Sequence, residues 1–205
     1  MAAVRPSTMI HTIAFKMLPC VLSNDHQVRI LIDGDDWLEA STLGLDPPEF
    51  FSQPALRSSG ELIVGRCDCG VLGCGDTTVD VSRELGLVKW TNANGLDLAF
   101  TELEFDHAIS FASNDFTWED CNRESERLAG QVLSGLELDG YRFQWVSTRI
   151  KDNTLTLSFI RRDQQRLIDL PWDGASSKNA VEVSQRFRNS RTNQAMHPSR
   201  GSADL

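Results

Sequence analysis

The chain has 205 residues, 40% of them hydrophobic and 24% charged, which is ordinary globular composition with enough apolar material for a good core. The net charge is −9, and this acidity argues against nucleic-acid binding because phosphate contacts need concentrated Lys and Arg. No stretch approaches the roughly 20 apolar residues of a membrane-spanning helix, so we expect no membrane segment.

The charge is unevenly distributed along the chain. Residues 1–140 carry 9 basic and 23 acidic side chains, a net charge of −14, whereas residues 141–205 carry 11 and 6, a net charge of +5. Two interpretations stay open. We favour the first, in which the two parts pack together and neutralise each other; in the second, an acidic face binds a basic protein partner.

We expect residues 1–26 to form a weakly structured lead. A partly apolar run over 9–18 is interrupted by His11 and Lys16, so it does not resemble the apolar region of a signal peptide. The five cysteines are an odd number, with three inside eight residues, unlike a secreted disulfide framework. The sequence therefore predicts a protein of the reducing cytoplasm.

Hydrophobic alternation and turn residues predict the next elements. They are a strand over 27–32, an acidic turn at 33–36, a helical start at 37–38, a helix from Pro47, a β-meander over 60–90 and a fourth strand over 96–100. A helix over 105–114 and a longer one over 117–136 follow, the latter with Thr117 as N-cap. Then come strands over 141–150 and 153–160, a strand over 167–172 and a last helix capped by Ser177.

This order predicts an α+β fold, with a mostly antiparallel sheet of a meander plus a hairpin packed with two or three helices. We expect a single domain over 27–189 and a disordered polar tail over 190–205. The helix over 117–136 should pack across the 141–160 hairpin. It should bury Cys121, Leu128, Val132 and Leu136 and expose Glu124, Glu126 and Arg127, while Leu157 faces the core and Thr156 faces away.

The feature of the sequence that most indicates a specific chemistry is the Gly-rich stretch over 66–75, which contains three cysteines. Cys67 and Cys69 lie on the same face of a strand, and the glycines that follow permit a reversal that brings Cys74 back over them. Three convergent thiolates are a good start on a zinc site. Two other interpretations stay open: small structural thiols in a turn, or thiols with redox chemistry.

A structural zinc site needs four ligands, and the motif supplies three. Cys121 and His107 downstream, or Cys20 in the lead, are the candidates for the fourth position. The spacing C-x-C-x4-C also differs from the usual double C-x2-C frame of zinc sites.

Two acidic groups have simpler explanations than a catalytic or metal site. The turn Asp33-Gly34-Asp35-Asp36 lacks the spacing of a calcium loop and is typical of a solvated turn. Glu102 and Glu104 are expected on the wet face of a strand, with Asp106 and His107 as a surface pair.

The stretch from Val64 to Val81, with Leu31–Leu38 before it and Pro171–Gly174 after it, resembles a group of uncharacterised bacterial proteins found in actinobacteria. The resemblance covers roughly residues 27–175 and implies a bacterial cytosolic protein. It implies no activity, cofactor or partner, and no functional residue follows from it.

The sequence holds no recognisable catalytic motif, so we favour a non-enzymatic interaction protein with a structural zinc knuckle. The alternative is a thiol-dependent enzyme or redox sensor that uses Cys67, Cys69 or Cys74.

Overall fold

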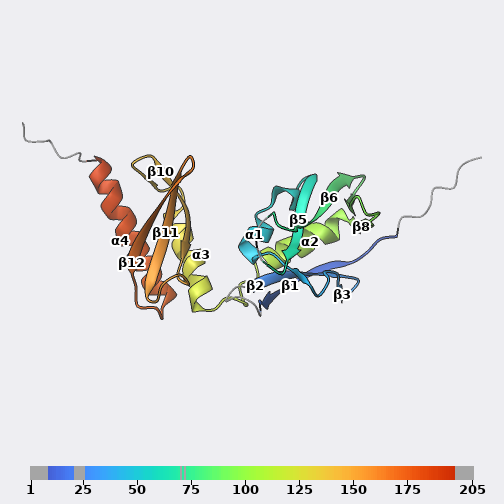
Figure 1. Cartoon of the computed structure of the whole chain (residues 1–205), viewed down its shortest axis with the longest axis horizontal. Coiled ribbons are helices and arrows are strands. Elements are labelled where there is room, and N and C mark those ends of the chain that lie inside the picture. The colour runs from blue at the N-terminus through green and yellow to red at the C-terminus, as the bar shows by residue number, and fades with distance from the viewer. Residues whose placement is uncertain (1–8, 21–25, 70, 72, 197–205) are drawn as a thin grey trace, which may run out of the picture. The chain divides into compact units, whose positions relative to one another are not determined.

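The computed structural model of the protein describes residues 9–20, 26–69, 71 and 73–196. The chain divides into two compact units, Met1–Trp118 and Glu119–Leu205, each with its own hydrophobic core (Figure 1). The boundary between Trp118 and Glu119 lies inside the range over which the sequence predicts one domain. The acidity belongs to the first unit, which holds 7 basic and 17 acidic residues, a net charge of −10.

The first unit is built from two antiparallel sheets. The smaller has the order β1-β2-β3, and the larger has the order β4-β5-β6-β7-β8. The strands of the smaller sheet are β1 (Ile13–Pro19), β2 (His26–Ile32) and β3 (Asp35–Asp36). Those of the larger are β4 (Thr42–Leu43), β5 (Gly60–Cys67), β6 (Thr77–Glu84), β7 (Leu87–Thr91) and β8 (Asp97–Thr101). The predicted meander is therefore confirmed.

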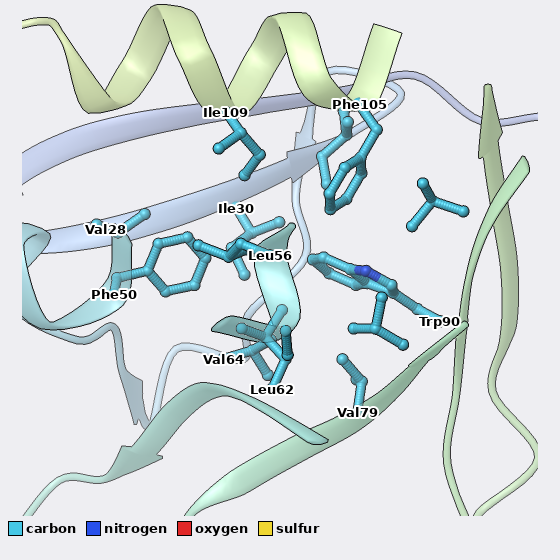
Figure 2. Close-up of a cluster of buried hydrophobic side chains, with 14 of the residues drawn as sticks. Val28, Ile30, Phe50, Leu56, Leu62, Val64, Val79, Trp90, Phe105 and Ile109 are labelled. Carbon is cyan, nitrogen blue, oxygen red and sulfur yellow. The ribbon is translucent and has the colours of Figure 1, made fainter. Parts of the chain in front are cut away.

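Three short helical segments complete this unit: α1 (Pro47–Phe51), the 3-10 turn η1 (Pro54–Leu56) and α2 (Glu102–Ser113). The core lies between α2 and the strands, and Figure 2 shows Phe105 and Ile109 of α2 facing side chains of the sheets. Trp90 of β7 is fully buried in it and meets the rings of Phe100 and Phe105 edge-on. In β2, side chains alternate between the two faces of the sheet, which explains why Val28, Ile30 and Ile32 are all buried.

The second unit is a four-stranded antiparallel sheet with two helices. The order in the sheet is β12-β11-β10-β9, and the helices are α3 (Cys121–Leu133) and α4 (Ser177–Met196). The strands are β9 (Glu137–Leu138), β10 (Tyr141–Ser147), β11 (Thr154–Arg161) and β12 (Gln164–Pro171). Both helices contribute to the core that covers one face of β11, where Leu155, Leu157 and Phe159 are fully buried. The α+β class and the mostly antiparallel sheets agree with the prediction.

Three predictions about the first unit are wrong. The lead is not weakly structured between Ile13 and Pro19, because β1 pairs along its whole length with β2. The segment that begins at Trp37 is not helical. Glu102 and Glu104 lie in the first turn of α2 rather than on a strand, since Thr101 caps the helix by accepting a hydrogen bond from the Glu104 N–H.

The helix α3 is shorter than the predicted helix over 117–136, and it buries a different set of side chains. Asp120, rather than Thr117, caps α3 by accepting from the Arg123 N–H at 2.8 Å. Cys121 is exposed instead of buried. Glu126 is not solvated, because it accepts hydrogen bonds from the Thr148 N–H and the Arg149 side chain.

The end of the chain also differs from the prediction. Residues 190–196 belong to α4, and residues 197–205 lie outside the described residues. Among the helices of the described ranges, none is long and apolar enough to cross a membrane.

Candidate metal centre

The three cysteines lie at the end of the β5–β6 hairpin. The register between the two strands shifts between Ile63 and Gly65, which marks a β-bulge. The side-chain amide of Gln53 fixes this point by bonding both the N–H and the C=O of Ile63 at 2.9 Å. Past the bulge, Cys67 pairs with Thr42 of β4, so the first cysteine stands on a paired strand rather than in a free loop.

The side chains of Cys67, Cys69 and Cys74 converge as the sequence predicts. Their three Sγ atoms all lie within 4.8 Å of one another, and those of Cys67 and Cys69 are 2.6 Å apart. A tetrahedral zinc ion with bonds of about 2.3 Å separates its sulfurs by about 3.8 Å. The cluster is thus already of the size of a metal site, with the first two sulfurs closer together than a bound ion would hold them.

Two glycines shape the return of the chain toward Cys67. Gly73 has a φ of +78°, in the left-handed region where a side chain is disfavoured. Gly75 passes directly against Cys67, since a Cβ at this position would lie 3.3 Å from the Cβ of Cys67 and 3.7 Å from its sulfur. Cys74, between the two glycines, is tied into a tight turn by its N–H, which donates to the C=O of Val71.

The environments of Cys69 and Cys74 differ, and so does the acidity of these two thiols. Hydrogen bonds from the Cys67 thiol, the Val71 N–H and the Cys74 thiol lower the pKa of Cys69. Hydrogen bonding to Cys69 and Cys67, and repulsion by their charges, raise the pKa of Cys74 to about 11. Cys69 is therefore the thiol of this pair that ionises first, and Cys74 is the one that gives up its proton last.

None of the predicted fourth ligands belongs to this group. Within the ranges that the structure describes, the set of ligand atoms within 4.8 Å of one another consists of the three cysteines alone. His107 is exposed on α2, where its ring stacks on Phe111. Cys121 is the first residue of α3 in the second unit, and Cys20 follows the end of β1.

One residue of the loop was missed by the sequence analysis. Asp76, two positions after Cys74, accepts a hydrogen bond from the Gly73 N–H through Oδ2 at 3.1 Å. Its second oxygen, Oδ1, is buried and has no hydrogen-bond partner. The signal in the sequence was the carboxylate itself, which extends the cysteine pattern to C-x-C-x4-C-x-D.

Carboxylates of both acidic groups considered from the sequence have structural partners in the protein. Asp33 binds the His11 ring at 2.6 Å and the Thr12 N–H, which closes the acidic turn against the strand beside it. Glu102 and Asp106 both bind the guanidinium of Arg83. Asp33, Glu102 and Asp106 therefore each have a structural partner.

Comparison with known proteins adds no assignment. The chain matches no protein-family model, no curated protein and no solved structure. Its function has to be argued from the cysteine loop and from the charge of the first unit.

Proposed function

We propose that Cys67, Cys69 and Cys74 bind a zinc ion, and that this knuckle stabilises the β5–β6 hairpin of a non-enzymatic interaction protein. The observation that supports the proposal is the convergence of three sulfurs, all within 4.8 Å of one another, at the end of one hairpin. Thiolates are soft ligands that favour zinc over magnesium or calcium, and structural zinc sites are tetrahedral with four donors.

A structural role follows from where the thiols come from. Cys67 ends a paired strand, while Cys69 and Cys74 are exposed residues of the connection to β6. In the described part of this connection, the Cys74 N–H donates to the Val71 C=O and the Gly73 N–H donates to Asp76. A bound ion would tie its two ends together, which is what structural zinc does in small loops that bury little apolar surface.

The partner that fits this protein best is a basic one. The net charge of −10 on residues 1–118 attracts positively charged surfaces and speeds their association at low ionic strength. A cytoplasmic location suits the proposal, because a reducing compartment keeps the three thiols free to bind metal.

A second candidate function is supported by the short distance between two of the sulfurs. Cys67 and Cys69, 2.6 Å apart, are placed for oxidation to a disulfide, and the pKa of Cys69 is lowered. In that reaction the Cys69 thiolate attacks a peroxide or a small disulfide, which leaves a sulfenic acid or a mixed disulfide. The Cys67 thiol then displaces water or the small thiol, so two electrons pass to the oxidant as the protein disulfide forms.

Metal analysis of three variants separates the two functions. Protein prepared without chelator or added metal is expected to contain one zinc per chain, and Cys69→Ser and Cys74→Ser to contain little or none. Cys121→Ser is the matched control, because Cys121 is an exposed cysteine outside the cluster. Metal-free protein whose cluster thiols react at once with a thiol reagent, without denaturant, would contradict the zinc proposal and favour the redox function.

A further inference from the structure

The loop contains a buried carboxylate oxygen that no protein group satisfies. It is Oδ1 of Asp76, the last residue before β6. A buried polar atom without a partner is costly, and for a carboxylate oxygen the cost is larger than for a neutral group. Such atoms in folded proteins call for a specific explanation, of which a bound ion is one.

The position of Asp76 ties it to the cysteine cluster. Its other oxygen binds the N–H of Gly73, the residue before Cys74. Gly75, the residue before Asp76, lies against the Cβ of Cys67. The segment over 73–76 therefore wraps from the third cysteine back to the first and ends at the carboxylate.

We infer that Asp76 is the fourth ligand of the metal centre, giving a site of three thiolates and one carboxylate. This inference rests on the proposed function, since it needs a metal at the cysteines. Zinc accepts Asp oxygen at about 2.0–2.2 Å, so a carboxylate completes its tetrahedral set. Asp76 stands outside the group of atoms within 4.8 Å of one another, and coordination therefore requires the carboxylate to move toward the sulfurs.

Few interactions oppose the movement of the Asp76 carboxylate toward the sulfurs. One hydrogen bond, from the Gly73 N–H, holds the carboxylate in the described arrangement. Around Gly73, the position of a Cβ has no heavy atom within 4 Å, so the turn has room to adjust. Binding would also give Oδ1 the partner that it lacks, which compensates for the change in the turn.

Asp76→Asn is the central variant for the test. An asparagine at this position keeps an oxygen that accepts the hydrogen bond from Gly73, and it removes the charged ligand. Asp68→Asn is the matched control, because Asp68 is an exposed carboxylate of the same loop and its loss changes the net charge by the same amount. The probe is Co²⁺, whose visible bands report the identity of four ligands and whose thiolate charge-transfer intensity reports the number of cysteines bound.

We expect unmodified protein and Asp68→Asn to bind one Co²⁺ with the same spectrum. Asp76→Asn should bind about tenfold or more weakly, with shifted visible bands and unchanged thiolate intensity. Asp76→Cys should raise the charge-transfer intensity by about one third, because a fourth thiolate joins three. Far-ultraviolet circular dichroism of the metal-free variants checks that each is folded.

The outcomes distinguish the inference from the function on which it rests. If Asp76→Asn matches Asp68→Asn in affinity and spectrum, or Asp76→Cys adds no charge transfer, Asp76 is not a ligand and the three-cysteine site stands alone. If the unmodified protein binds no Co²⁺ or Zn²⁺, the proposed function fails first.

Discussion

Leu157→Ala is the substitution that most directly probes the core of the second unit. Leu157 lies in the middle of β11 with no exposed surface. It pairs with Val146 of β10 on one side and Ile168 of β12 on the other. The change removes three carbon atoms from a site enclosed on both edges by neighbouring strands.

The size of the loss follows from those three carbons. At about 0.8 kcal/mol for each buried CH₂-sized group, the transfer term is about 2.4 kcal/mol. The cavity adds to this, since strands paired on both sides of β11 cannot close around it, and the total should approach the upper part of the 2–5 kcal/mol range for such changes. Thr156→Val nearly keeps the volume of the threonine side chain and removes one hydrogen bond, from the Thr156 hydroxyl to the Asp169 carboxylate, worth about 1.5 kcal/mol.

Urea unfolding of the two variants measures the difference, and hydrogen exchange locates it. Leu157→Ala should lose protection within residues 119–205, where its core lies. Thr156 is itself only 1% exposed, so its face of the sheet is not the open one that the sequence suggested. Equal losses for the two variants would refute the view that the helix-covered face carries most of the stability.

Three further outcomes follow from single residues. In metal-free protein at neutral pH, iodoacetamide should modify Cys69 before Cys74, because the pKa of Cys69 is lowered and that of Cys74 is raised to about 11. Mass spectrometry measures the order, and modification of Cys74 first would contradict these pKa directions. Burial raises the pKa of Glu126 above its ordinary 4.5, so the folded state keeps this proton to higher pH than the unfolded state. The free energy of unfolding should therefore fall as pH rises from about 4.5 through the raised pKa, and Glu126→Gln should flatten that part of the profile measured by urea unfolding at a series of pH values. Gly44→Ala places a Cβ 2.0 Å from the C=O oxygen of Val28, a backbone atom, and should lower the free energy of unfolding by about 1–3 kcal/mol in the same assay. An unchanged free energy of unfolding would mean that Gly44 and Val28 are not in contact.

The parts of the fold that the sequence predicted are those that depend on local patterns. Alternation located the strands of the meander and the 141–160 hairpin, and same-face spacing with glycines predicted that Cys67 and Cys74 would meet. These signals lie within a few residues of one another, so one short segment contains all the information that they need.

Ile13–Pro19 is an exception, since Ile13, Phe15 and Met17 alternate with more exposed residues and this local signal for a strand was not used. Other errors arise where contacts with residues far along the chain determine the position of a side chain. Glu126 is largely buried and accepts a hydrogen bond from Arg149, which lies 23 residues later in the chain. At the site, Asp76 was missed because one carboxylate after Cys74 is a weak signal in the sequence, whereas the burial of its unpartnered oxygen requires coordinates to see.

X-ray absorption at the zinc edge tests the central claim most directly, because it reports the atoms bound to the metal. The zinc-loaded protein should show three sulfur atoms at about 2.3 Å and one lighter atom at about 2.0–2.2 Å. A zinc shell made of oxygen and nitrogen alone would contradict the account, since the metal would then be bound away from Cys67, Cys69 and Cys74.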